Sequence, residues 1–199
     1  MNKKLFLILP AFIFSIGLFA QKLSVEVNYV TSESTSNSNT IYYKPGELLT
    51  WDDFKGKPVA GSDAVALTGA GFGLKLAFHR VGNTSELVIS VSCSFSKKDS
   101  WVLPGNKTSY ILNHEQKHFD IAYINTFLFI QNLRNAHFTN ANYASAIEKV
   151  YNETASAMSK IQDQYDMETS HSRIPEKQAD WDQKISGQLK SVNIKSGNE

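Results

Sequence analysis

Hydrophobic and polar positions divide the chain into a strand-rich first half and a helical second half. Short alternating or apolar runs occupy 22–30, 40–43, 64–80 and 86–96, and Gly, Pro and Asn turn signals separate them. From Thr108 onward, apolar residues recur instead at steps of three and four. Strands followed by helices predict an α+β domain with an antiparallel or mixed twisted sheet.

Two helices joined by a short turn are predicted in the second half. Residues 108–134 are apolar nearly all round, which indicates a helix buried on most sides. A short turn near His137 makes the two helices an antiparallel hairpin, in which His114 comes level with Lys160. We therefore expect the segment 164–173 to emerge beside His114. The apolar stripe of the second helix consists of Ala144, Ile147, Tyr151, Thr154, Met158, Ile161 and Tyr165.

The two ends of the chain differ from this central region. Residues 1–20 combine two lysines, an apolar run and a small final residue, a pattern typical of a secretory signal peptide. An uncleaved membrane anchor is the alternative. We expect a signal peptide at 1–20, one domain at 21–190 that ends in a terminal helix, and a flexible tail at 191–199. The protein is thus predicted to be secreted or periplasmic, without stable membrane insertion after cleavage.

Charge and cysteine content limit the classes of partner. The chain has 20 basic and 19 acidic residues, and removal of the first twenty would leave 18 against 19, a net charge near −1. This balance argues against nucleic acid and anionic membrane surfaces as partners. The single cysteine, Cys93, lies in an alternating strand, so an intramolecular disulfide is impossible and we expect a buried thiol.

The stretch NHEQKHFDIA, residues 113–122, places two histidines and a glutamate in the apolar first helix. His114 and His118 are four residues apart, so both side chains lie on one helical face and can bind one metal ion. Glu115 lies on the adjoining strip, where it can reach a water bound to that ion without being a ligand. This H-E-x-x-H pattern predicts a Zn²⁺ site in which Glu115 activates the zinc-bound water. A pair of hydrogen-bonded core histidines is the less favoured alternative.

A catalytic zinc ion usually has three protein ligands, so a third must be found. Ile121 and Ile124 occupy the positions where the longer pattern H-E-x-x-H-x-x-G-x-x-H has Gly and His, which excludes that source. The hairpin favours the segment that follows the second helix. We predict His171 as the third ligand, with Asp166 and Glu168 as open alternatives.

Tyr165 ends the apolar stripe and has both a catalytic and a structural interpretation. Its hydroxyl could donate a hydrogen bond to an oxyanion that develops beside the metal, or its ring could belong to the core. Asp166 likewise could orient a histidine ligand instead of binding the metal itself.

Several segments together resemble a bacterial family of uncharacterised proteins described as predicted secreted zinc-dependent proteases. These segments are LTWDDFKGKP (49–58), SWV (100–102), NHEQKHFDIA (113–122), YDMETSHS (165–172) and QADWDQKI (178–185). The resemblance covers most of the chain after residue 20 and implies a zincin-like fold with Glu115 as the catalytic carboxylate. It also implies His114, His118 and His171 as zinc ligands. One departure is Ser172, where the family usually has Gly.

These features predict a secreted zinc metallopeptidase that acts on a peptide or protein substrate. A zinc-dependent amidase of cell-wall peptides and a non-catalytic, metal-stabilised binding module are the alternatives. Replacement of Glu115 by Gln separates the catalytic interpretations from the binding one, because only hydrolysis needs the carboxylate.

Overall fold

The computed structural model describes residues 22–31, 39–82 and 84–196 of the 199-residue chain. The predicted signal peptide at 1–20 lies outside this part. The described strands are β1 (Lys22–Tyr29), β2 (Thr40–Tyr42), β3 (Ala66–Leu67), β4 (Ala70–Val81), β5 (Thr84–Ser96) and β6 (Trp101–Val102). The helices are η1 (Trp51–Asp53), α1 (Ser109–Asn135), α2 (Tyr143–Thr169) and α3 (Pro175–Ser196). The protein is therefore α+β, as the sequence predicts.

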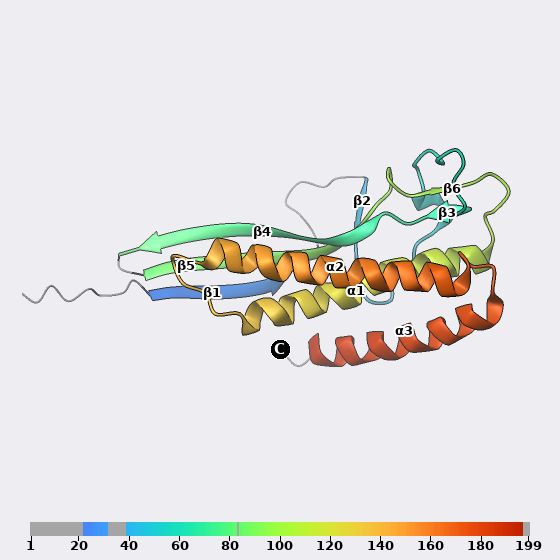
Figure 1. The fold of residues 1–199 in the computed structure, drawn as a ribbon. Helices are drawn as coiled ribbons and strands as arrows, with labels where there is room; N and C mark the ends of the chain where they lie inside the picture. Colours follow the sequence, from blue (N-terminus) through green and yellow to red (C-terminus); the bar gives the residue numbers. More distant parts are fainter. Residues whose placement is uncertain (1–21, 32–38, 83, 197–199) are drawn as a thin grey trace, which may run out of the picture.

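The long strand β5 forms the centre of a mixed sheet (Figure 1). β1 pairs with the first part of β5 in parallel, and β2 pairs with its last residues in the antiparallel direction. β4 runs antiparallel along the other side of β5. Alternate residues of β5 have no exposed surface, namely Leu87, Ile89, Val91, Cys93 and Phe95. Because successive side chains of a strand point to opposite faces, one face of β5 is buried. Cys93 lies on this face, so the prediction of a buried thiol is confirmed.

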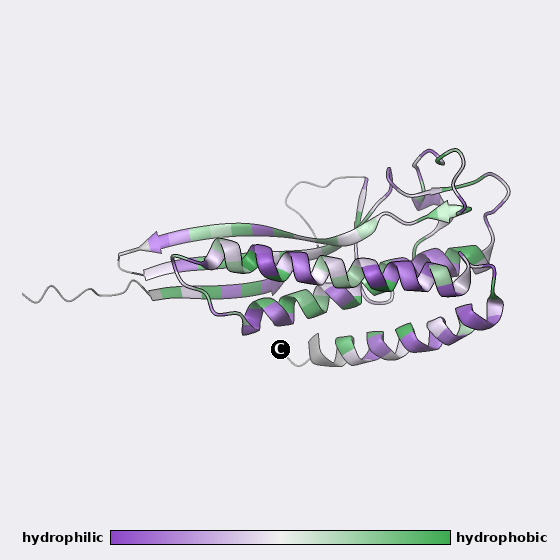
Figure 2. Ribbon diagram, in the orientation of Figure 1, coloured by the Kyte–Doolittle hydropathy of each residue, from purple (hydrophilic) through white to green (hydrophobic). Residues whose placement is uncertain are grey.

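The helix α1 is the central element of the helical half. It contacts β1, β4 and β5 of the sheet as well as both other helices. Its first turn is capped by Thr108, whose Oγ1 accepts a hydrogen bond from the amide of Ile111 at 3.1 Å. Because buried residues occur on most sides of α1, the prediction of a buried helix is confirmed. Hydrophilic and hydrophobic residues alternate along α2 and α3 (Figure 2).

The helix α2 lies antiparallel to α1, but the residues of α2 that lie opposite the histidines of α1 come later in the chain than the sequence predicts. His118 contacts Gln162, and His114 contacts Asp166 instead of lying level with Lys160. α2 also continues one turn beyond the predicted end of the apolar stripe. This extra turn brings Asp166 opposite the histidines while it is still part of the helix.

Two local features determine this register. Before α2, Thr139 and Asn142 bond reciprocally: the Thr139 amide donates to Asn142 Oδ1 at 2.7 Å, and the Asn142 amide donates to Thr139 Oγ1 at 3.2 Å. At the other end, α2 stops at Ser170, which adopts a left-handed conformation with φ of 50°. The turn is therefore centred later in the chain than His137.

The terminal helix α3 extends further than expected. Its inner face buries Trp181, Ile185 and Val192 against the core. The helix continues to Ser196, beyond the start of the tail predicted at residue 191, and Val192 is buried. Within the described residues, no helix combines the length and the hydropathy needed to cross a membrane.

Candidate metal centre

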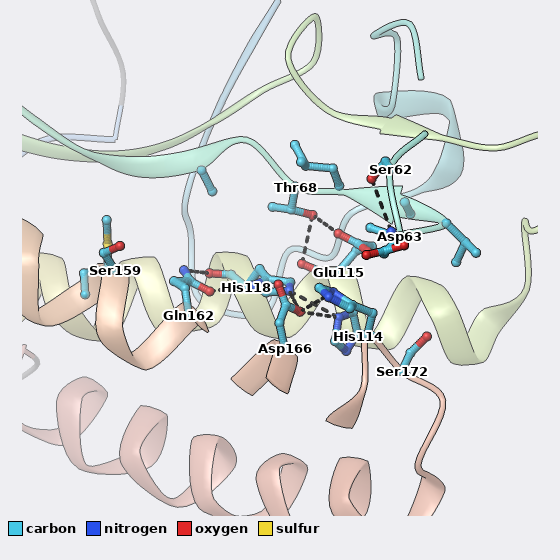
Figure 3. Close-up of a pocket in the computed structure, with 17 residues that line it drawn as sticks. Ser62, Asp63, Thr68, His114, Glu115, His118, Ser159, Gln162, Asp166 and Ser172 are labelled. Carbon is cyan, nitrogen blue, oxygen red and sulfur yellow. Dashed lines mark hydrogen bonds and ion pairs between the residues drawn. The ribbon is translucent and has the colours of Figure 1, made fainter. Parts of the chain in front are cut away.

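His114, His118 and Asp166 form a group that could hold a metal ion (Figure 3). The Nε2 atoms of His114 and His118 are 3.2 Å apart. Asp166 Oδ1 lies 3.1 Å from His114 Nε2 and 3.0 Å from His118 Nε2. Atoms bound tetrahedrally to one ion at about 2.0–2.1 Å are roughly 3.3 Å from one another. The three side chains therefore already have the spacing of ligands around one ion.

Gln162 of α2 fixes the protonation of the His118 ring. Its Nε2 donates to the main-chain oxygen of His118 at 3.0 Å, which identifies this end of the side chain as the NH₂ group. Its Oε1 therefore faces His118 Nδ1 and must accept a hydrogen bond from it. His118 consequently carries its proton on Nδ1.

Gln178 of α3 fixes the His114 ring in the same way. Its Nε2 donates to Asp182 Oδ1 at 2.8 Å and to the Tyr165 hydroxyl at 2.6 Å. Its Oε1 lies 2.9 Å from His114 Nδ1 and accepts a hydrogen bond from that nitrogen. A hydrogen bond from the nitrogen that does not bind the metal is the usual way in which a histidine ligand is oriented.

With Nδ1 protonated, the neutral form of each ring directs its Nε2 lone pair at the other ring and at the Asp166 carboxylate. Three electron-rich atoms at 3.0–3.2 Å repel one another unless a cation or a proton lies between them. Burial by itself would raise the pKa of Asp166, but the hydrogen bonds that the two rings donate when Nε2 carries a proton outweigh burial and hold this pKa well below its usual range. Once Nε2 of each ring has lost its proton, the group offers one anionic oxygen and two imidazole nitrogens, a donor set that fits a divalent metal ion.

In the absence of a metal ion, a proton can take its place. Burial opposes protonation of His118, but the hydrogen bond and charge of Asp166 and the charge of Glu115 outweigh burial and raise the pKa of His118. A metal ion must therefore displace a proton at this site, and its binding is expected to weaken as the pH falls.

Glu115 lies beside the three-residue group without belonging to it. Its side chain is 3% exposed, and its Oε2 accepts a hydrogen bond from Thr68 Oγ1 at 2.7 Å. Burial raises the pKa of Glu115, although His118 and His114 act in the opposite direction. The carboxylate of Glu115 is thus held in one orientation next to the three-residue group. No pattern in the sequence identifies Thr68 as its hydrogen-bond partner.

A cavity of about 490 Å³ opens over the group. The segment 62–68 lines one side of it, and Met158, Ser159 and Gln162 of α2 line the other. The first wall is held in place by the pairing of β3 with β6 and by a hydrogen bond of 2.9 Å from the Gly69 amide to Ser100 Oγ. The segment 100–102, part of the family resemblance, therefore supports the cavity wall.

His171, the third ligand predicted from the sequence, lies at the rim. It lines the cavity, and its Nδ1 is 3.5 Å from Asp166 Oδ1, but it does not belong to the three-residue group. Ser170, His171 and Ser172 have φ values of 50°, 51° and 68°, so three consecutive residues with side chains adopt the left-handed conformation. The structure thus places Asp166, one of the alternatives, in the position expected for His171. The other alternative, Glu168, instead accepts a hydrogen bond from the Trp181 indole at 2.8 Å.

Tyr165 lies behind His114 and does not line the cavity. It has no exposed surface, and its ring stacks on that of His114 with a centroid distance of 4.6 Å and an interplanar angle of 22°. Its hydroxyl donates to the main-chain oxygen of His114 at 3.3 Å and accepts from Gln178. This geometry supports the structural interpretation of Tyr165 and offers no path from its hydroxyl to an oxyanion.

Comparisons with known proteins do not assign the chain to a family. No family model matches it, and no curated protein and no solved structure matches it at a significant level. The functional interpretation therefore rests on the geometry of the metal centre.

Proposed function

We propose that the protein is a secreted zinc metallopeptidase with His114, His118 and Asp166 as metal ligands. The observation that carries this proposal is the convergence of three lone-pair atoms at 3.0–3.2 Å, with both Nδ1 protons held by glutamines. Two imidazoles and one carboxylate are a donor set common in catalytic zinc sites. The α+β fold, with both histidines on a buried helix after the sheet, supports a zincin-like assignment.

Glu115 is the residue that we expect to move protons. When bound, zinc would supply Lewis acidity that polarises a substrate carbonyl and lowers the pKa of a coordinated water molecule. Glu115 is next to the ligands, and its pKa is raised by burial, which suits a carboxylate that accepts a proton and later donates it to a leaving amine. Thr68 keeps the carboxylate in place at its Oε2.

The cavity supports a peptide or amide as the substrate. Its volume of about 490 Å³ is in the range of ligand sites, and its wall 62–68 has exposed and half-buried residues around β3. The same chemistry would serve a cell-wall amide, so the substrate screen must include both kinds of bond. The signal-peptide pattern of residues 1–20 supports the proposed secretion.

The test compares the wild type with Glu115→Gln and with a matched control, Glu148→Gln, which changes an exposed glutamate of α2. We expect near-stoichiometric zinc in all three proteins, measured by elemental mass spectrometry. Hydrolysis of a peptide library and of cell-wall peptides should fall about 10²–10⁴-fold in Glu115→Gln only. Absence of zinc in the wild type would refute the metal site. A zinc-loaded wild type that cleaves no substrate would instead refute the peptidase assignment and favour the binding module.

A further inference from the structure

The C-terminal helix α3 reaches the metal centre through Gln178. This side chain is 1% exposed, and its amide makes three hydrogen bonds: one from His114 Nδ1, one to Tyr165 and one to Asp182. Asp182 in turn accepts a hydrogen bond of 2.9 Å from Asn113 of α1. A chain of polar contacts thus joins α3 to the residue that precedes the first ligand.

The rest of α3 is attached in a way that allows it to separate from the site. The helix follows the turn 170–174, packs on α1 and α2, and buries an apolar stripe that includes Trp181 and Ile185. Terminal elements with one buried face are commonly the first parts of a domain to open. Separation of α3 would remove the only acceptor that the described residues offer to His114 Nδ1.

We infer that docking of α3 and binding of the metal are energetically coupled through Gln178, and this inference rests on the metal site proposed above. With α3 docked, His114 is held with its proton on Nδ1 and its Nε2 free for the metal. With α3 undocked, the ring can rotate and can place the proton on Nε2, where it blocks coordination. A metal ion on Nε2 also makes Nδ1–H a stronger donor to Gln178.

The coupling acts equally in both directions. If docked α3 raises metal affinity by some factor, bound metal stabilises docking of α3 by the same factor. Loss of such an outer hydrogen bond typically lowers metal affinity about 10–100-fold. A partner that displaces α3, or a protease that cuts the turn before it, would therefore promote release of the metal. Gln178 is in this sense a positioning residue through which the end of the chain regulates the site.

The first experiment measures zinc affinity by competition with a chromophoric chelator. Gln178→Leu should bind zinc about 10–100-fold more weakly than the wild type, whereas Gln183→Leu, at an exposed position of the same helix, should match the wild type. The double variant Gln178→Glu/Asp182→Asn keeps an acceptor for His114 and reverses both hydrogen bonds of the former Gln178 amide nitrogen, because the new amide at position 182 and the Tyr165 hydroxyl become the donors. This double variant should recover most of the affinity, which a general loss of packing in Gln178→Leu would not predict.

The second experiment follows amide hydrogen exchange in α3 with and without zinc. In the wild type, zinc should slow exchange of the amides around Gln178. In Gln178→Leu, zinc should still protect α1 and α2 near the ligands but no longer protect α3. Affinity within twofold of the wild type in Gln178→Leu, or exchange in α3 that does not respond to zinc, would overturn the coupling and leave the metal site intact. A wild type that takes up no zinc would overturn both, and a zinc-loaded protein without hydrolysis would affect only the peptidase assignment.

Discussion

His118 and Gln162 share two hydrogen bonds across the interface between α1 and α2. The side-chain nitrogen of Gln162 donates to the main-chain oxygen of His118 at 3.0 Å, and Gln162 Oε1 accepts a hydrogen bond from Nδ1 of the same histidine. The side chain of Gln162 thus forms hydrogen bonds with both the backbone and the ring of His118, a proposed ligand. Because both groups are fixed together, His118 Nε2 is directed at the proposed metal position without the help of a bound ion.

Replacement of Gln162 by Leu should therefore weaken zinc binding without unfolding the protein. The leucine keeps the size of the side chain but removes the acceptor for Nδ1, so we expect affinity to fall roughly 10–100-fold. Competition with a chelator measures this, with Gln164→Leu as an exposed control on the same helix. Equal affinities in the two variants would show that the tautomer of His118 does not depend on Gln162.

The choice between Asp166 and His171 as the third ligand gives a second prediction. In Asp166→Asn, a neutral amide replaces the carboxylate that lies 3.0–3.1 Å from both Nε2 atoms, so zinc content should fall to near zero after dialysis. In His171→Ala, the three-residue group is intact and zinc content should stay near stoichiometric. Elemental mass spectrometry of the two variants side by side distinguishes them. The reverse result would place His171 in the ligand set, as the family resemblance implies.

Tyr165→Phe separates a structural hydroxyl from a catalytic one. The variant leaves the amide of buried Gln178 without one acceptor, and we expect the free energy of unfolding to fall by about 1–3 kcal/mol. Hydrolysis per bound zinc should change by no more than a few-fold, because the hydroxyl does not line the cavity. Urea unfolding and activity normalised to zinc content are the measurements, with Tyr151→Phe as the control. A loss of about 10²-fold or more at full zinc loading would restore the oxyanion role.

Sequence alone predicts the position of the two histidines because helical geometry is local. A separation of four residues places His114 and His118 on one face wherever the helix lies. Apolar neighbours such as Phe119 and Ile121 indicate that this helix is buried, and both are 2% exposed in the fold. Two of the three members of the metal group therefore follow from a stretch of five residues.

The third member depends on tertiary register, which no local pattern specifies. Whether Asp166 or His171 faces the histidines is determined by where the turn between α1 and α2 is centred and where α2 ends. These points depend on the contacts of Thr139 with Asn142 and on a left-handed Ser170, and other sequences make such contacts in many positions. The two candidates are five residues apart, so a shift of roughly 1.4 helical turns exchanges them.

The outer contacts of the site were beyond sequence reasoning for a different reason. Glutamine is most often a surface residue, so Gln162 has no feature that distinguishes it from its neighbours, and the spacing of Gln178 with Trp181 and Ile185 indicates only that it lies on the inner face of the terminal helix. Only the fold shows that Gln178 is 1% exposed and that each amide meets a histidine. Thr68, which lies between β3 and β4, donates a hydrogen bond to Glu115, and no sequence pattern predicts this contact either.

The buried Cys93 provides a prediction that is independent of the metal. Its thiol has no exposed surface, and burial raises its pKa from 9.0 to about 12, with the Thr126 hydroxyl acting weakly in the opposite direction. A thiol reagent at pH 8 should therefore not react with the native protein and should react once in urea. Rapid reaction without denaturant would show that β5 opens readily or that the thiol is accessible.

The same raised pKa predicts how stability changes in alkali. Above pH 9 the unfolded chain loses the thiol proton while the folded chain keeps it up to about pH 12, so ionisation favours the unfolded state throughout this window. The contribution of Cys93 is thus present below pH 9 and is lost by about 1.4 kcal/mol for each pH unit above it. Burial also raises the pKa values of Tyr29, Tyr43 and Tyr165, so the free energy of unfolding falls more steeply with pH than one thiol alone would cause.

Urea unfolding of the wild type and Cys93→Ala at pH 8, 9.5 and 10.5 separates the contribution of the thiol from that of the tyrosines, because both proteins contain the same tyrosines. The stabilities of the two proteins should approach each other as the pH rises, and parallel curves would exclude a thiol that is neutral in the fold.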